Sequence, residues 1–152
     1  MSRMKKRTYL ILLFILCIIG FVFINFKYID VKNKHDELQK AIDDRFRYQL
    51  SNVQSSFGME VNDYTYRFML SSVSNAVSLS ELTTFEDVND ELDVSLHSLY
   101  VSLREERSKD KTLLRIDEIR EIFSMLVLEP TSKEATDKLF EITKETFFNV
   151  ED

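Results

Sequence analysis

Residues 9–24 read YLILLFILCIIGFVFI, an unbroken apolar run, and Asn25 is the only polar residue before Phe26. Counted to Ile29, the segment has about 21 residues and measures roughly 31 Å as a helix at ~1.5 Å per residue, which is enough to cross a bilayer core. Backbone polar groups cannot remain unpaired in lipid, so the segment is expected to be helical. The sequence therefore predicts a transmembrane signal-anchor helix over residues 9–29, with membrane lipid as its partner.

A cleaved signal peptide is the main alternative to a permanent anchor. The apolar region of such a peptide is normally ~7–15 residues long and ends at a small-x-small cleavage site, whereas this run continues from Gly20 into large side chains. A bacterial lipoprotein signal needs a small residue before its cysteine, but Leu16 precedes Cys17. A pilin-type leader needs a Glu within the apolar helix, and the run has none. These departures favour an uncleaved anchor.

The charges on the two sides of the run determine its expected orientation. The numbers of basic residues on the two sides are nearly equal, so they alone do not decide it. Four basic residues precede the run (Arg3, Lys5, Lys6, Arg7) and four follow it closely (Lys27, Lys32, Lys34, Lys40). All 26 acids lie beyond residue 29, so residues 27–152 hold 16 basic and 26 acidic side chains, a formal charge of −10. We expect a short basic cytoplasmic tail over residues 1–8 and an acidic extracytoplasmic domain over residues 30–152. The Ile-, Lys-, Phe- and Asn-rich usage suggests an AT-rich genome, such as that of a low-GC Gram-positive bacterium, so the expected location is a bacterial cell membrane.

Composition favours an all-α fold for the rest of the chain. The 152 residues include only two Gly and one Pro, which leaves few turn residues for a strand-rich fold. The single Cys excludes an internal disulfide framework and a Cys-based zinc cluster. The expected architecture is one transmembrane helix followed by an antiparallel helical bundle built on one long helix.

The long helix is predicted from a single apolar stripe. Nine apolar residues follow one another at steps of three or four, which places them on one helical face: Leu38, Ile42, Phe46, Leu50, Val53, Phe57, Val61, Tyr64 and Phe68. The helix is expected to run from about Ile29 to about Ser78. Gly58 is the expected bend or break, because Gly costs about 1 kcal/mol relative to Ala inside a helix.

Three shorter helices are expected to pack against the long one. Capping-box patterns at Thr83 or Thr84 predict a second helix with an apolar stripe, namely Phe85, Val88, Leu92, Leu96, Leu99 and Leu103. The polar run 104–111 is expected to be a loop. A third helix over residues 112–128 should end before Pro130, with Leu113, Ile116, Ile119, Phe123, Leu126 and Val127 inside. A Thr131–Glu134 capping box then predicts a last helix to about Asn149, burying Ala135, Leu139, Ile142, Thr146 and Phe147.

The N-terminal half of the long helix has few expected partners within the chain, so its apolar face is the candidate interaction surface. That surface consists of Leu38, Ile42, Phe46, Leu50 and Phe57. An uncovered apolar stripe usually marks an association surface. The alternative is that the remainder of the bundle covers the same stripe.

No catalytic, cofactor-binding or metal-binding residues are predicted. The acidic run 86–93 lacks the Gly that a calcium loop needs and is better explained as acids at a helix start. Asp93 and His97, four residues apart, form at most a two-ligand site. Phosphate loops and nucleophile elbows need glycines that are missing, and nucleic acid is not an expected partner of the acidic domain. Tyr64, Tyr66 and Arg67 are expected to divide between core and surface.

These features predict a non-enzymatic, single-pass membrane protein that acts as an interaction or accessory subunit. It would dock through helix-on-helix contacts with a membrane partner or with itself. The alternative is an extracytoplasmic helical-bundle ligand sensor that acts through a partner's membrane helix. An enzyme is the third choice, because no acid–base or nucleophile constellation is present in the sequence.

Overall fold

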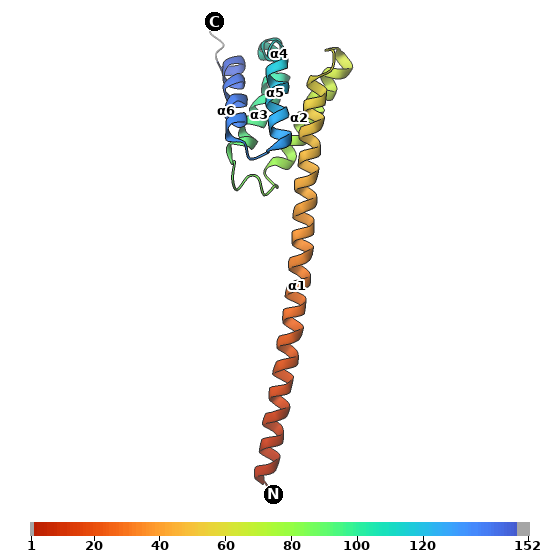
Figure 1. Ribbon diagram of the computed structural model, residues 1–152, viewed down its shortest axis with the longest axis vertical. Helices are drawn as coiled ribbons and strands as arrows, with labels where there is room; N and C mark the ends of the chain where they lie inside the picture. The colour runs from red at the N-terminus through yellow and green to blue at the C-terminus, as the bar shows by residue number, and fades with distance from the viewer. Residues whose placement is uncertain (1, 149–152) are drawn as a thin grey trace. The chain divides into compact units, whose positions relative to one another are not determined.

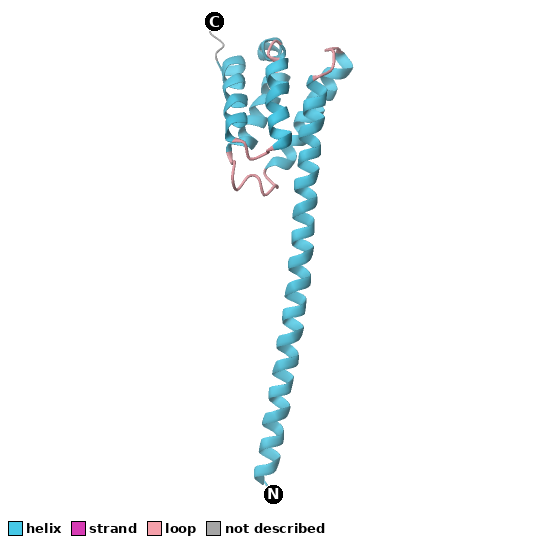
Figure 2. Ribbon diagram, in the orientation of Figure 1, coloured by secondary structure: helices cyan, strands magenta, loops and turns pink. Residues whose placement is uncertain are grey.

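The structure is a computed structural model that describes the backbone of residues 2–148 and the side chains of residues 12–146. All regular elements in this part of the chain are helical, which confirms the all-α class (Figure 2). They are α1 (Ser2–Phe57), α2 (Asp63–Ser80), α3 (Glu91–Arg104), α4 (Glu106–Leu113), α5 (Ile116–Leu128), α6 (Lys133–Thr143) and the π-helical segment η1 (Lys144–Phe148). The chain divides into two compact units, Met1–Leu38 and Gln39–Asp152.

The predicted long helix is interrupted at Gly58, as expected. α1 ends at Phe57, and the amide of Gly58 donates to the carbonyl of Ser55 in a closing turn, N to O 3.1 Å. α2 then begins with Asn62 as its N-cap, whose Oδ1 accepts from the amides of Tyr64 and Thr65 at 3.0 and 3.1 Å. Thr65 Oγ1 accepts from the Asn62 amide in return, which completes a capping box. The predicted single helix is therefore two helices. This is possible because the amides near the break find hydrogen-bond acceptors close by, in the Ser55 carbonyl and the Asn62 side chain.

The predicted start of the next helix at Thr83 or Thr84 is wrong. Thr83 Oγ1 donates back to the Ser80 carbonyl at 2.9 Å. Thr84 donates both its amide and its hydroxyl to the Asp43 carboxylate of α1, at 2.9 and 2.6 Å. Neither side chain is free to cap a helix, so residues 81–90 form turns and α3 starts at Glu91.

These turns also change which apolar residues are buried. Val88, expected in the stripe, is exposed, while Phe85 packs its ring against Phe46 at a centroid distance of 6.1 Å. Buried Asn89 fixes the end of the segment by donating to Thr136 Oγ1 at 2.8 Å and to the Pro130 carbonyl at 3.3 Å. Tertiary hydrogen bonds, rather than local capping, determine the shape of residues 81–90.

The polar run after α3 is helical rather than a loop. Glu105 adopts an extended conformation that separates α3 from α4. Ser108 is fully buried and donates to the Ser102 carbonyl at 2.8 Å, and Thr112 donates to the Ser108 carbonyl at 2.9 Å. The Ser108 hydroxyl therefore attaches α4 to the end of α3, whereas the Thr112 bond lies within α4. α5 starts at Ile116 instead of Thr112.

The end of α5 and the turn before α6 follow from Pro130. α5 ends at Leu128, and Glu129 before the proline is extended, as predicted. The cap of α6 is Ser132, whose Oγ accepts from the Ala135 amide at 3.4 Å, and not Thr131. α5 and α6 lie side by side and run in opposite directions (Figure 1). α6 changes to η1 at Lys144, before the predicted end at Asn149, which lies outside the described residues.

The core of the second unit is formed by buried apolar residues of α1, α2, α3, α5 and α6. α3 contacts α2, α4, α6 and η1, and α1 packs its Phe57 ring on Phe123 of α5 at 6.1 Å. The buried apolar residues are Phe46, Leu50, Val53, Phe57, Met69, Val73, Ala76, Leu92, Leu96, Leu99, Leu103, Ile119, Ile122, Phe123, Leu126, Ala135, Leu139 and Ile142. The predicted α6 positions Ala135, Leu139, Ile142 and Thr146 are buried, and the side chain of Phe147 lies outside the described residues.

Replacing the fully buried Phe46 by Ala should destabilise the second unit by about 3–5 kcal/mol, because the change leaves a cavity beside Phe85. Leu38→Ala is the matched control from the same stripe, and since Leu38 is exposed it should change stability by about 0.5 kcal/mol or less. Urea unfolding of both full-length variants in mild detergent, followed by circular dichroism, measures the difference. Equal midpoints would contradict the described core.

Candidate interaction surface

The five residues of the predicted interaction surface do not form one exposed face. Phe46, Leu50 and Phe57 are buried in the core of the same chain, whereas Leu38 is 62% exposed and Ile42 is half-buried. From Phe46 onward the stripe is therefore covered by the rest of the bundle, which is the alternative that the sequence left open. Leu38 and Ile42 remain accessible, so the predicted surface is reduced to its first two members.

This placement corrects the role assigned to Phe46 and Leu50. A pair of Glu substitutions at these positions would bury two unpaired carboxylates in the core, which costs far more than any lost association. Loss of binding in such a variant would report unfolding and not docking. Residues used to test association must therefore come from exposed positions.

A long uncovered apolar surface follows α1 from Leu12 onward. The described part of α1 that can cross a membrane by length and composition begins at Leu12, and its most apolar window has a mean hydropathy of 2.4 with none of it buried. The large apolar side chains from Leu12 to Phe26 are all exposed. Beyond Ile29 the surface becomes polar, beginning with an ion pair between Asp30 and Lys34 at 2.9 Å. Hydrogen bonding to Asp30 raises the pKa of the Lys34 amine.

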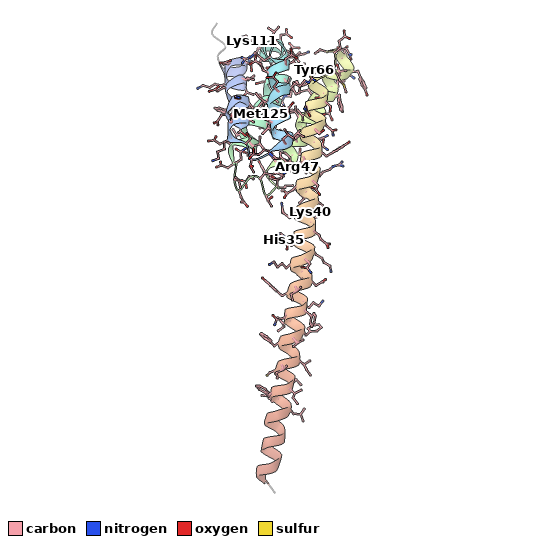
Figure 3. The ribbon with its side chains drawn as sticks, in the orientation of Figure 1. His35, Lys40, Arg47, Tyr66, Lys111 and Met125 are labelled. Atoms are coloured by element: carbon pink, nitrogen blue, oxygen red, sulfur yellow. The ribbon has the colours of Figure 1, made fainter. Side chains whose placement is uncertain are left out.

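A hollow of about 310 Å³ lies between α5 and α6 in the second unit. Its lining combines apolar side chains with acids and two bases: Arg115, Glu118, Glu121, Ile122, Met125, Lys138, Glu141, Ile142 and Glu145. Met125 on α5, labelled in Figure 3, is part of its apolar floor. Lys138 is held by Glu134 at 2.6 Å on the same helix.

Arg115 connects the two walls of this hollow. Its Nη1 lies 2.6 Å from the Glu145 carboxylate on η1, and its Nη2 donates to Glu118 on α5 at 2.7 Å. Hydrogen bonds that the Arg115 guanidinium donates to these two carboxylates raise its pKa, and Arg115 in turn lowers the pKa of the Glu118 carboxyl. The spacing of Arg115 and Glu118 is visible in the sequence, but the contact with Glu145 exists only in the folded chain.

The acidic run 86–93 is distributed along the turns and the first turn of α3. Glu86, Asp87, Asp90 and Glu91 are exposed, and acids at the start of α3 are favourable to the helix dipole. Asp93 and His97 line a second hollow between α2 and α3, and Asp93 Oδ1 is buried without a hydrogen-bond partner. Among the described residues, no group of three or more His, Cys, Asp or Glu side chains is placed to hold a metal ion.

The aromatic and basic residues near the start of α2 have separate environments. Tyr64 is exposed, while the Tyr66 hydroxyl donates to the Leu103 carbonyl and its ring lies 4.1 Å from Lys109 Nζ. Burial, with a smaller contribution from Asp110, raises the pKa of Tyr66. Tyr66 therefore holds α2 against the end of α3.

No protein-family model, curated protein or solved structure matches this chain.

The Arg115–Glu118 pair predicts a pH-dependent contribution to stability. Because the folded-state pKa of Glu118 is lowered, the contribution is present above the unfolded-state pKa of Glu and is lost as pH falls through the folded-state value. Glu118→Gln should therefore lower the melting temperature slightly at pH 7, and this difference should disappear in acid. Glu121→Gln on the same helix, which removes an exposed carboxylate with no ion pair among the described side chains, is the control. A difference that persists in acid would contradict the ion-pair explanation.

Proposed function

We propose that the protein is a single-pass, membrane-anchored helical accessory protein that acts by docking and not by catalysis. The N-terminus faces the cytoplasm and the acidic bundle is presented outside the membrane. The observation that carries the proposal is the apolar segment of α1, which is long enough to cross a bilayer and is covered by no other described part of the chain.

The exposure of this segment separates it from a core helix of a soluble protein. A core helix passes a hydropathy test equally well but is covered by its own fold, as residues 46–57 of α1 are here. Exposing apolar surface to water costs about 25 cal/mol per Å². The uncovered segment therefore needs lipid or another apolar partner. The basic residues before the segment and the acidic domain after it favour the stated orientation.

The bundle is well suited to binding another protein through its surface. Its buried apolar residues form one core. Most of the acidic side chains that give residues 27–152 their formal charge of −10 lie on its surface. Ile42, which is half-buried, adds partly accessible apolar area to this unit. A partner with a basic, partly apolar surface complements these properties.

The anchor is tested by placing two charges in it. Leu16→Lys with Ile19→Lys should move the protein from the carbonate-resistant membrane fraction to the soluble fraction, since each Lys costs about 2.5–3.5 kcal/mol in a span. Tyr64→Lys with Leu114→Lys, at two exposed bundle positions, is the matched control and should remain in the membrane. Fractionation of a bacterial host that expresses each variant gives the result.

Orientation and processing are measured on the unaltered chain. Protease added to spheroplasts should digest the bundle, and mass spectrometry should find the residues before Phe26 in the mature protein. A mature chain that starts after Phe26 and is released into the medium would overturn the anchor. A bundle protected from protease in intact spheroplasts would reverse the orientation.

The hollow between α5 and α6 favours a second candidate function, that of a ligand sensor acting through a membrane partner. Glu121 and Glu141 line it without an ion pair to any described side chain, beside the apolar floor of Ile122 and Met125. This lining suits an organic cation. Spermidine should then raise the melting temperature of the full chain in detergent, and Glu121→Gln with Glu141→Gln should remove the increase. Equal stabilisation of both proteins would exclude this site.

A further inference from the structure

One face of the apolar segment of α1 differs from the others in shape. Ile15, Ile18, Val22, Asn25 and Ile29 follow one another at steps of three, four, three and four, so they lie along a single line on the helix. Four of the five are β-branched, whereas Leu and Phe predominate elsewhere in the segment. We name these five residues the seam.

The seam is recessed relative to the rest of the helix surface. Ile15, Ile18, Val22 and Ile29 are 49%, 48%, 46% and 53% exposed, while the other large apolar side chains from Leu12 to Phe26 are 60–70% exposed. Residue type does not explain the difference, because Ile19 and Ile24 off the seam are 62% and 67% exposed. Neighbouring side chains of the helix therefore cover more of the seam than of the other apolar positions. A hollow of about 250 Å³ lies along it, lined by Phe21, Val22, Asn25, Phe26 and Ile29.

Asn25 gives the seam a polar group that lipid cannot satisfy. Its Nδ2 donates to the Phe21 carbonyl at 2.8 Å, one turn earlier. The Oδ1 acceptor and the second N–H have no partner among the described residues. An amide carries both a donor and an acceptor, so the group that satisfies it best is a second amide in the opposite orientation. When two identical helices pack about a twofold axis, the Asn25 amide of one helix meets the Asn25 amide of the other in this opposite orientation.

We propose that the seam is a self-association surface, and that its occupant is the seam of a second copy of this chain. This inference rests on the proposed membrane anchoring. All copies of an anchor insert in one orientation and at one depth, so the two helices are parallel and Asn25 lies opposite Asn25 of the second copy. The β-branched side chains lose little rotamer freedom on packing, and the recessed line allows the two backbones to approach closely.

The proposal is tested by disulfide crosslinking of full-length protein in native membranes. Cys17, the only cysteine, is first changed to Ser, and a single cysteine is then placed on the seam with Val22→Cys. Phe23→Cys, one residue further and about 120° away from the seam centre, is the matched control. Mild oxidation should give a covalent dimer from Val22→Cys and little from Phe23→Cys.

The amide is tested in the Val22→Cys protein. Asn25→Leu should lower the dimer yield about threefold or more, whereas Ile24→Leu, an exposed position off the seam, should leave it unchanged. Equal crosslinking of Val22→Cys and Phe23→Cys would overturn the self-association surface. A dimer yield unaffected by Asn25→Leu would overturn the amide pairing that selects a second copy as the occupant.

The same membranes separate failure of the inference from failure of the proposed function. Each variant is extracted with carbonate before oxidation, and the fraction that remains in the membrane is measured. A protein that is absent from this fraction overturns both the anchor and the seam. A protein that remains there without preferential crosslinking at residue 22 overturns only the seam.

Discussion

The apolar side chains of α1 must be shielded from water along most of the helix, and two different means of shielding are required. From Phe46 to Phe57 the other helices of the second unit and the turns over residues 81–90 cover one face, with Phe85 against Phe46 and Phe123 against Phe57. From Leu12 to Ile29 the apolar side chains point in all directions, so no single packed neighbour can cover them. A lipid solvent does so without specific contacts, which is the physical basis for the proposed anchor.

Helical class and the principal breaks were predictable because they depend on local chemistry. Gly58 and Pro130 act through their own backbone properties, and the helices end near both. The segment 81–90 was mispredicted because its polar residues bond to distant parts of the fold, and the segment 104–115 because its buried hydroxyls bond to nearby carbonyls. Thr84 resembles a cap in the sequence, but its hydroxyl and amide are used by Asp43, which is 41 residues away. Ser108 belongs to a strongly polar run, yet it is buried beneath the end of α3.

The candidate surface was only partly predictable for a related reason. Periodicity shows which residues share a face but does not show whether that face is covered by the same chain. The stripe continues unbroken from Leu38 to Phe57, while its exposure falls sharply between Ile42 and Phe46 where the bundle begins to cover it. Asn25 was visible as the one polar residue in an apolar run, but its open acceptor and the hollow beside it depend on three-dimensional structure.

The charge distribution favours different partners for the proposed anchor and for the bundle. Residues 27–152 carry a formal charge of −10, so two copies of the bundle repel one another at close range, and this repulsion is screened over about 8 Å at physiological salt. The seam carries no charge, and contact between two seams in lipid adds no such repulsion. For the proposed membrane-anchored protein, self-association is therefore favoured in the apolar segment, while the acidic surface of the bundle is complementary to a partner of opposite charge. A stable complex of two acidic bundles without their anchors would contradict this division.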